Sequence, residues 1–234
     1  MCTVTFIPQN NNSFLFTSNR DEAPDRSTIA PEVYTLDNTQ VLFPKDEVAG
    51  GTWIGLSDKQ RLVCLLNGGF TAHERADSYR MSRGLLVTEL LTTKDISEAI
   101  NTYNFNGIEP FTLITVAYET TTQIFELVWD GTTAHFAEKP LQPHIWSSSL
   151  LYNKEAKALR EAWFSEFIFT TMRPSAKEIK TFHKTAGIGN ADIDLIMNRG
   201  FVKTKSITQI EKTEHSLWMQ YEDLHNQQQT KTTF

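Results

Sequence analysis

Short runs of apolar and β-branched residues dominate the first two-thirds of the chain. Residues 3–7 and 13–18 are two such runs, and the Gln- and Asn-rich residues 9–12 between them form a turn sequence. This pair therefore predicts a β-hairpin. Further strands are predicted at residues 53–56, 62–66, 112–118 and 124–129. Several of these runs carry apolar residues on both faces, which is typical of strands covered on both sides.

The hydrophobic period becomes helical in two places. Residues 82–91 and 153–169 each place their apolar side chains on one stripe, which consists of Leu86, Val87, Leu90 and Leu91 in the first and of Ala156, Leu159, Trp163, Phe164 and Phe167 in the second. Shorter helices are predicted at 175–183 and 192–199, and strands return at 203–210 and 217–221. Strands, then helices, then closing strands predict an α+β fold with mainly antiparallel sheets.

Two segments lack a clear period. Residues 23–38 contain prolines and predict a long loop, and residues 227–234 form a polar tail that we expect to fray. The chain has no repeats, no heptads and no low-complexity linker. We therefore expect a single domain over residues 1–226, followed by the polar tail at 227–234.

Composition excludes several classes of protein. The 234 residues are 40% hydrophobic and 21% charged, as in ordinary globular proteins, and the net charge of −6 argues against nonspecific nucleic-acid binding. No apolar run is long enough to span a membrane, and the N-terminus does not resemble a signal peptide, so we expect a cytoplasmic protein. The six histidines are scattered without partner cysteines, and no phosphate-binding glycine loop is present. We therefore expect neither a metal site nor a cofactor.

The second residue is the most specific chemical signal. If Met1 is removed, Cys2 carries both a thiol and a free α-amine, and the amine can take the thiol proton without a separate histidine base. The alternative is that Cys2 is a small apolar residue at the start of a strand. The other cysteine, Cys64, lies in an apolar run and is predicted to be a buried core residue.

A polar run follows the second predicted strand, where residues 18–22 read Ser-Asn-Arg-Asp-Glu. A hairpin of the first two strands would bring this run beside Cys2. The Asp21 carboxylate could then orient the α-ammonium, and the Arg20 guanidinium could lower the thiol pKa or hold an anionic substrate. The alternative is a charged turn in solvent.

Three further motifs carry possible chemistry. Residues 49–55 read Ala-Gly-Gly-Thr-Trp-Ile-Gly, where the paired glycines permit a close backbone approach or a positive φ. Asn67 precedes Gly68 and Gly69 at a strand end, which suits either an oxyanion hole or a common turn. Arg83 lies in a first helical turn, where the helix dipole disfavours a cation, so it is expected to reach an anionic ligand or an internal carboxylate.

Together these motifs resemble a known family. Met-Cys-Thr at the start, Ser-Asn-Arg-Asp-Glu at 18–22, Ala-Gly-Gly-Thr-Trp-Ile-Gly at 49–55, Leu-Leu-Asn-Gly-Gly at 65–69 and Ser-Arg-Gly at 82–84 occur in this order. The chain resembles the NRDE family, also called the transport and Golgi organization protein 2 family. Where that family usually carries Ser-Asn before its central helix, this chain has three serines at 147–149.

The family in turn resembles N-terminal nucleophile (Ntn) hydrolases of the cysteine class, such as penicillin V acylase and bile salt hydrolase. The resemblance implies a four-layer αββα sandwich and hydrolysis of a linear, non-peptide amide C–N bond or a related acyl bond in a small molecule. It implies catalytic roles for Cys2, Arg20, Asp21 and Asn67, which we expect to converge in one cleft. Arg20 and Asp21 are adjacent here, whereas the acylases commonly separate this pair by three residues. Candidate substrate-binding residues are Asn19, Trp53 and Arg83.

Two other functions are considered. The resemblance also permits a non-catalytic carrier of haem or lipid, active in binding or trafficking, because eukaryotic members are associated with Golgi organisation and such ligands. The abundant aromatic residues would then line an apolar pocket. A purely structural interaction module has no support, since the sequence contains neither a coiled coil nor a recognisable peptide-binding groove.

Overall fold

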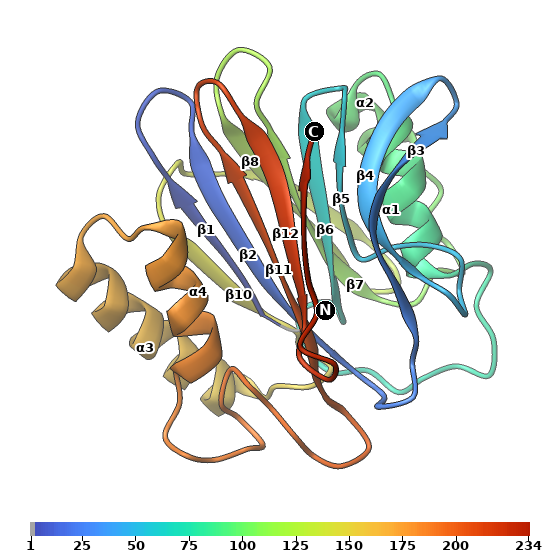
Figure 1. Ribbon diagram of the computed structural model, residues 1–234. Helices are drawn as coiled ribbons and strands as arrows, with labels where there is room; N and C mark the ends of the chain where they lie inside the picture. Colours follow the sequence, from blue (N-terminus) through green and yellow to red (C-terminus); the bar gives the residue numbers. More distant parts are fainter. Residues whose placement is uncertain (1–2) are drawn as a thin grey trace. The chain divides into compact units, whose positions relative to one another are not determined.

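The computed structural model describes residues 3–234 and forms two compact units (Figure 1). Unit 1 contains the chain up to Arg26 together with Gln142–Phe234, and unit 2 contains Ser27–Leu141. Each unit has one antiparallel sheet with two helices, so each is described by itself.

Unit 1 is built on a six-stranded sheet with the order β10-β1-β2-β11-β12-β13. Figure 1 shows α3 and α4 side by side on one face of this sheet, where apolar side chains of β1 and β2 pack against both helices. The elements are β1 (Thr3–Pro8), β2 (Phe14–Glu22), β10 (His144–Ser147), α3 (Lys154–Thr171), α4 (Ala176–Thr185), β11 (Lys203–Lys212), β12 (Leu217–Asp223) and β13 (Gln229–Thr233).

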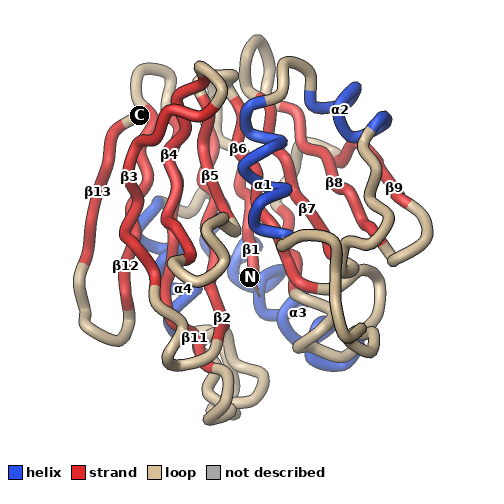
Figure 2. The backbone as a smooth tube through the Cα atoms, turned by 90° about the vertical axis from the view of Figure 1, so that its right-hand side faces the viewer, coloured by secondary structure: helices blue, strands red, loops and turns tan. Residues whose placement is uncertain are grey.

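Unit 2 is built on a seven-stranded sheet whose strands follow chain order, β3 to β9. Figure 2 shows α1 running along the face of this sheet over β5 and β6, where Leu86, Val87, Leu90 and Leu91 are fully buried. The elements are β3 (Thr28–Leu36), β4 (Thr39–Asp46), β5 (Ile54–Ser57), β6 (Arg61–Asn67), α1 (Arg83–Thr92), α2 (Ile96–Thr102), β7 (Phe111–Ala117), β8 (Gln123–Trp129) and β9 (Ala134–Lys139).

The central strand β6 confirms the prediction of strands that are buried on both faces. Its five consecutive residues from Leu62 to Leu66 are at most 4% exposed, including Cys64. Val63 and Leu65 join the core beneath α1, while Leu62, Cys64 and Leu66 point to the opposite face. An uninterrupted apolar run is therefore required here, because neither face of the strand meets solvent.

Three of the predicted helices begin directly after a capping residue. The Ser82 side chain accepts from the Gly84 N–H at the start of α1, Asn153 accepts from Ala156 N–H at the start of α3, and Ser175 forms a capping box with Glu178 at the start of α4. The stripe predicted for α3 is wrong in part. Leu159 is 39% exposed, whereas the neighbouring Arg160 is fully buried. The hydrogen bonds of Arg160 are described with the candidate site below.

The loop predicted at residues 23–38 is wrong, because most of it forms the edge strand β3. Pro31 lies where the β3–β4 register shifts, between Ile29 and Glu32, and a bulge on an edge strand tolerates a residue without an N–H. The polar tail is also ordered. Residues 229–233 form β13, and Lys231 lies over the Trp218 ring at 3.9 Å from its centroid.

The helix predicted at 192–199 is absent from the described structure, where these residues form turns and an isolated bridge from Asn198 to Lys203. The Leu195 carbonyl accepts from the Asn19 side chain, and the Met197 N–H donates to Thr204 Oγ1. Side chains of β2 and β11 thus take the hydrogen bonds that a helix would have made internally.

The paired glycines confirm the expected close approach. Gly50 has φ +73°, and a Cβ on Gly51 would lie 2.4 Å from the Gly84 carbonyl carbon. The Thr52 N–H donates to the Gly84 carbonyl at 3.1 Å, so the strand entry and the start of α1 touch backbone to backbone.

We expect Gly51→Ala to lower the free energy of unfolding by about 2–3 kcal/mol, because two backbones must separate to admit the methyl group. Gly50→Ala is the matched control, since nothing lies within 4 Å of its Cβ position and only its positive φ opposes the change. That strain costs about 1 kcal/mol. Urea denaturation of both variants measures the difference, and equal losses would contradict the close packing of Gly51 against α1.

Candidate active site

The polar run Ser-Asn-Arg-Asp-Glu lies inside β2, not in a turn after it. Asn19, Arg20 and Asp21 are 0%, 3% and 3% exposed, so the alternative of a charged turn in solvent is wrong. The predicted hairpin is confirmed, and its register sets Thr3 opposite Asn19. Arg20 and Asp21 therefore follow at the end of β2 that lies beside the start of β1. Cys2 itself lies outside the described residues.

The Asp21 carboxylate is held by two hydroxyl groups. The Tyr152 hydroxyl donates to Oδ2 at 2.6 Å, and the Thr204 hydroxyl donates to Oδ1 at 2.6 Å. Such O–H···O⁻ bonds are short and strong because the acceptor is charged. Each carboxylate oxygen of Asp21 is thus fixed in position by a different segment of the chain.

A β-bulge brings Thr204 to the Asp21 side of the sheet. Arg20 pairs with Ser206, but Asp21 pairs with Thr204, so Lys205 is an extra residue in β11. In an unbroken β11, Lys205 would pair with Asp21, and Thr204 would share the face of Ser206 and Arg20, because side chains alternate along a strand. The bulge therefore turns the Thr204 hydroxyl toward Asp21.

Tyr152 lies between Asp21 and a buried cation. Its hydroxyl faces Asp21, while the Arg160 guanidinium carbon lies 3.4 Å from the centroid of its ring. Arg160 is fully buried and donates to the carbonyls of Ile193 and Asp194 at 2.9 and 2.8 Å, and also to the Thr3 hydroxyl. The guanidinium thus fixes the beginning of β1 and the ring that supports Asp21.

Asn19 was expected to bind substrate, but its amide holds parts of unit 1 together. Both amide hydrogens are donated to backbone carbonyls, of His183 at 3.1 Å and Leu195 at 2.8 Å. The amide oxygen lies 2.8 Å from His183 Nδ1, so that nitrogen carries the hydrogen and Nε2 accepts from the Thr5 hydroxyl at 2.8 Å. The hydrogen-bonding atoms of the Asn19 amide are thus engaged within unit 1, and its contact with a substrate stays a prediction.

His183 is fully buried in this chain of hydrogen bonds. Burial, reinforced by the positive charge of Arg160, lowers the pKa of His183 from 6.5 to about 3. The imidazole is neutral at physiological pH and has both nitrogens engaged. It fixes α4 to β1 and β2 and is not placed to act as a free base.

Arg20 points to the opposite face of β2 from Asp21. Consecutive strand residues alternate, and Arg20 shares its face with the buried Phe16 and Ser18, whereas Asp21 shares its face with Asn19 and the helices. Its guanidinium lies 4.0 Å from the Glu22 carboxylate. The two residues, expected to act side by side, therefore present their charges on different faces of the sheet.

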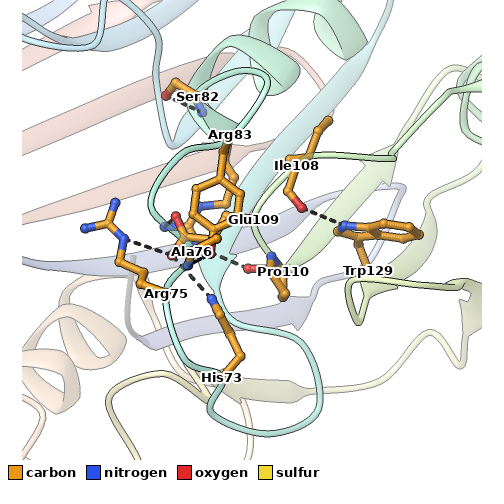
Figure 3. A network of polar contacts seen from close by, with 11 residues as sticks. His73, Arg75, Ala76, Ser82, Arg83, Ile108, Glu109, Pro110 and Trp129 are labelled. Carbon is orange, nitrogen blue, oxygen red and sulfur yellow. Dashed lines mark hydrogen bonds and ion pairs between the residues drawn. The ribbon is translucent and has the colours of Figure 1, made fainter.

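The remaining predicted residues belong to unit 2. Asn67 is the last residue of β6, as expected, and is half-buried. Trp53 is 5% exposed and precedes β5 directly. Arg83 contacts an internal carboxylate, since its guanidinium lies 3.1 Å from Glu109 and donates to the Pro110 carbonyl at 3.0 Å (Figure 3). The expected convergence on Cys2 lies outside the described residues and stays a prediction.

Sequence reasoning missed several residues that hold the candidates in place: Tyr152, Arg160, His183 and Thr204 in unit 1 and Glu109 in unit 2. Tyr152 and Thr204 are 131 and 183 positions away from Asp21, and no local pattern joins such distant residues. The one available signal was Arg160, a cation on the apolar stripe of a predicted helix, which would be costly to bury without a function or partners.

No group of three metal-binding side chains is found among residues 3–234. Over the same residues, none of the helices has the length and apolar character needed to cross a membrane.

A family model described as "Transport and Golgi organisation 2" matches residues 1–232. The chain belongs to this family. No sequence among the curated proteins matches the chain. The family assignment therefore rests on a match to nearly the whole chain and agrees with the motifs found in its first 90 residues.

Three solved structures that are similar to this chain carry the names of hydrolases. Penicillin V acylase from Agrobacterium tumefaciens is 12% identical, with a TM-score of 0.60 over 100% of this chain and 86% of that one. A cysteine-to-alanine mutant of conjugated bile acid hydrolase from Clostridium perfringens is 10% identical, with a TM-score of 0.61 over 100% and 92%. A Caenorhabditis elegans N-acylethanolamine-hydrolyzing acid amidase ortholog is 12% identical, with a TM-score of 0.61 over 89% and 92%. These likenesses confirm the predicted α+β fold of the Ntn-hydrolase type.

The buried histidine makes the stability of the protein depend on pH. The unfolded chain protonates His183 below about pH 6.5, while the folded protein keeps it neutral down to about pH 3. Unfolding then takes up a proton, so stability falls as the pH decreases through this window, by about 1.4 kcal/mol per pH unit. In His183→Gln this contribution is absent. We expect the stability advantage of the wild type over this variant to shrink between pH 6 and pH 4.

Urea denaturation at several pH values measures this advantage. His215→Gln, at an exposed position, is the control, and its free energy of unfolding should change with pH as that of the wild type does. A constant difference between the wild type and His183→Gln from pH 6 to pH 4 would contradict a neutral, buried His183.

Proposed function

We propose that this protein is an Ntn cysteine hydrolase that cleaves a linear, non-peptide amide bond, or a related acyl bond, of a small molecule. Cys2 is the nucleophile after removal of Met1. The substrate is bound without a cofactor, and the reaction takes place in the cytoplasm.

The arrangement around Asp21 carries this proposal. A carboxylate buried at 3% exposure, with both oxygens held by hydroxyl groups, occupies the strand that pairs with the start of β1. Thr3, which follows Cys2 in the chain, is itself bonded to Arg160. A rigid carboxylate next to a rigid strand start suits the binding of an α-ammonium group. The fold likeness to an acylase, a bile acid hydrolase and an acid amidase supports the same reaction class.

The chemistry follows from a thiol and an amine on one residue. The Cys2 α-amine takes the thiol proton, and Sγ attacks the amide carbon to give a tetrahedral intermediate. The resulting ammonium protonates the leaving nitrogen, and the C–N bond breaks to leave a thioester on Cys2. A water molecule then attacks the thioester while the amine accepts its proton, and the acid product leaves as the thiol is restored.

The other residues have supporting roles in the proposal. Asp21 orients the α-amine and stabilises its charged form. The Asn67 side-chain amide, with a backbone N–H, donates to the oxyanion. Arg20 either favours the thiolate or holds a negative group of the substrate, and Trp53 provides an apolar wall. Because Arg83 is committed to Glu109 and Pro110, its part is positional.

The central experiment combines mass spectrometry with an amidase assay. We expect protein isolated from its own cells to lack Met1 and to hydrolyse acyl p-nitroanilides of some chain length. Cys2→Ala should abolish this activity, since no other nucleophile is proposed. Cys64→Ala is the matched control and should stay active, because Cys64 is a fully buried core residue.

Retention of Met1, or hydrolysis by Cys2→Ala, would refute the mechanism. A saturable shift of the haemin Soret band that survives Cys2→Ala, without amidase activity in the wild type, would favour the haem carrier instead.

A second prediction concerns Tyr152. Tyr152→Phe removes the hydroxyl that fixes Asp21 but keeps the ring beside Arg160. We expect kcat to fall about tenfold with KM unchanged, because a mobile carboxylate orients the amine less well. The free energy of unfolding should fall by only about 1–3 kcal/mol. Tyr34→Phe, on β3, is the control and should leave both kinetic constants as in the wild type. An unchanged kcat in Tyr152→Phe would remove Tyr152 from the proposed mechanism.

A further inference from the structure

A second buried carboxylate, Glu109, lies in the segment between α2 and β7 and is contacted by one histidine and two arginine side chains (Figure 3). His73 Nε2 and Arg75 Nε each lie 3.3 Å from Oε1, and the Arg83 guanidinium lies 3.1 Å from Oε2. The Glu109 side chain is 6% exposed and Arg83 13%, whereas Arg75 is 74% exposed. The Arg83 pair is therefore the strongest of the three, because solvent screens the contact of Arg75.

The same guanidinium reaches the turn that follows Asn67. Arg83 donates through its second amino group to the Pro110 carbonyl at 3.0 Å, and the Gly68 N–H donates to that same carbonyl at 3.0 Å. The Gly68 carbonyl in turn accepts from the Thr112 hydroxyl at 3.0 Å. The N–H of Gly68 is thus hydrogen-bonded to Pro110, just before β7, and its carbonyl to Thr112 in β7.

The turn has a backbone geometry that requires glycine. Gly68 has φ +87°, a conformation that side-chain-bearing residues rarely adopt. Gly69 lies so close to the Trp129 carbonyl that a Cβ would approach it to 3.0 Å. Since Gly68 follows Asn67 directly, the fixed turn determines the direction in which β6 ends and hence where the Asn67 side chain starts.

Arg83 is a rigid anchor for this turn because it belongs to the first turn of α1. That turn is packed against the backbone of Gly51 and accepts a hydrogen bond from Thr52 N–H at the Gly84 carbonyl. A cation at a helix N-terminus is disfavoured by the helix dipole, and the Glu109 carboxylate offsets this cost. The ion pair with Glu109 thus explains why an arginine occupies the first turn of α1, where a cation is unfavourable.

We propose that Glu109 and Arg83 are positioning residues for the Asn67 amide. Glu109 orients the Arg83 guanidinium through their ion pair. Arg83 then donates to the Pro110 carbonyl, and the same carbonyl accepts from the N–H of Gly68, the residue after Asn67. This inference rests on the proposed function, in which the Asn67 amide stabilises the oxyanion. A donor of that kind is effective only when its direction is set before the reaction begins.

The structural part of the test does not require activity. Glu109→Gln keeps the shape of the side chain but removes the charge that aims Arg83. We expect the Gly68 amide to exchange hydrogen about fivefold faster or more, and the Asn67 side-chain NH₂ signals to shift in ¹H–¹⁵N spectra. Glu126→Gln is the matched control. It removes the carboxylate that lies 3.5 Å from Lys139 within the same sheet and should change neither signal.

Arg83→Lys provides a second variant should Glu109→Gln not fold. Lysine keeps the charge beside Glu109 but lacks the planar fork that contacts Glu109 and Pro110 together. Gly68 exchange should lie between the wild type and Glu109→Gln. Wild-type exchange at Gly68 and unchanged Asn67 signals in either folded variant would overturn the proposal.

The kinetic part separates positioning from mere support of the fold. On the amide substrate that the wild type hydrolyses, Glu109→Gln should lower kcat about tenfold or more with KM nearly unchanged. Faster Gly68 exchange with an unchanged kcat would overturn the positioning role. If the wild type hydrolyses no amide, the proposed function fails, while the Gly68 and Asn67 signals still decide whether Glu109 orders this turn.

Discussion

A strand that buries an amide and a carboxylate must provide hydrogen-bond partners for both, and unit 1 is organised by this constraint on β2. An unsatisfied buried polar group costs about 1–3 kcal/mol, and a buried charge costs more. Asn19 and Asp21 lie on the same face of β2, and their partners come from four separate segments. The position of α4, the course of residues 186–203 and the bulge in β11 all satisfy these two side chains.

The bulge illustrates how one extra residue can build a site. An unbroken β11 would direct the Thr204 hydroxyl away from Asp21 and would set Lys205 against it. With the bulge, Asp21 gains a neutral donor in place of a second formal charge. Hydroxyl donors hold a carboxylate in place without cancelling its charge, and the role proposed for Asp21 requires this property.

The sequence was sufficient for the elements whose pattern is local. The amphipathic stripes predicted α1 and α3 to within a few residues, and the hairpin of β1 and β2 followed from its turn. The sequence was insufficient where tertiary contacts override the local preference for helix, strand or loop. The carbonyl of Leu195 accepts a hydrogen bond from Asn19, so no helix forms there. The edge strand β3 is interrupted by Pro31, and β13 is too polar to be recognised without its neighbour.

The residues of the candidate site also fall into a group that local motifs predict and a group that they do not. In addition, the two buried carboxylates, Asp21 and Glu109, differ in the type of donor that holds them. Motifs identified Asp21, Arg83 and Asn67, but not the residues that orient them, because those lie far away in the sequence. Asp21 accepts hydrogen bonds from the hydroxyl groups of Tyr152 and Thr204, and these two donors are uncharged. Glu109 is held by guanidinium groups, which offset its charge and make it an anchor. A carboxylate satisfied by neutral donors can take part in chemistry, whereas one satisfied by cations is better suited to hold other groups in place.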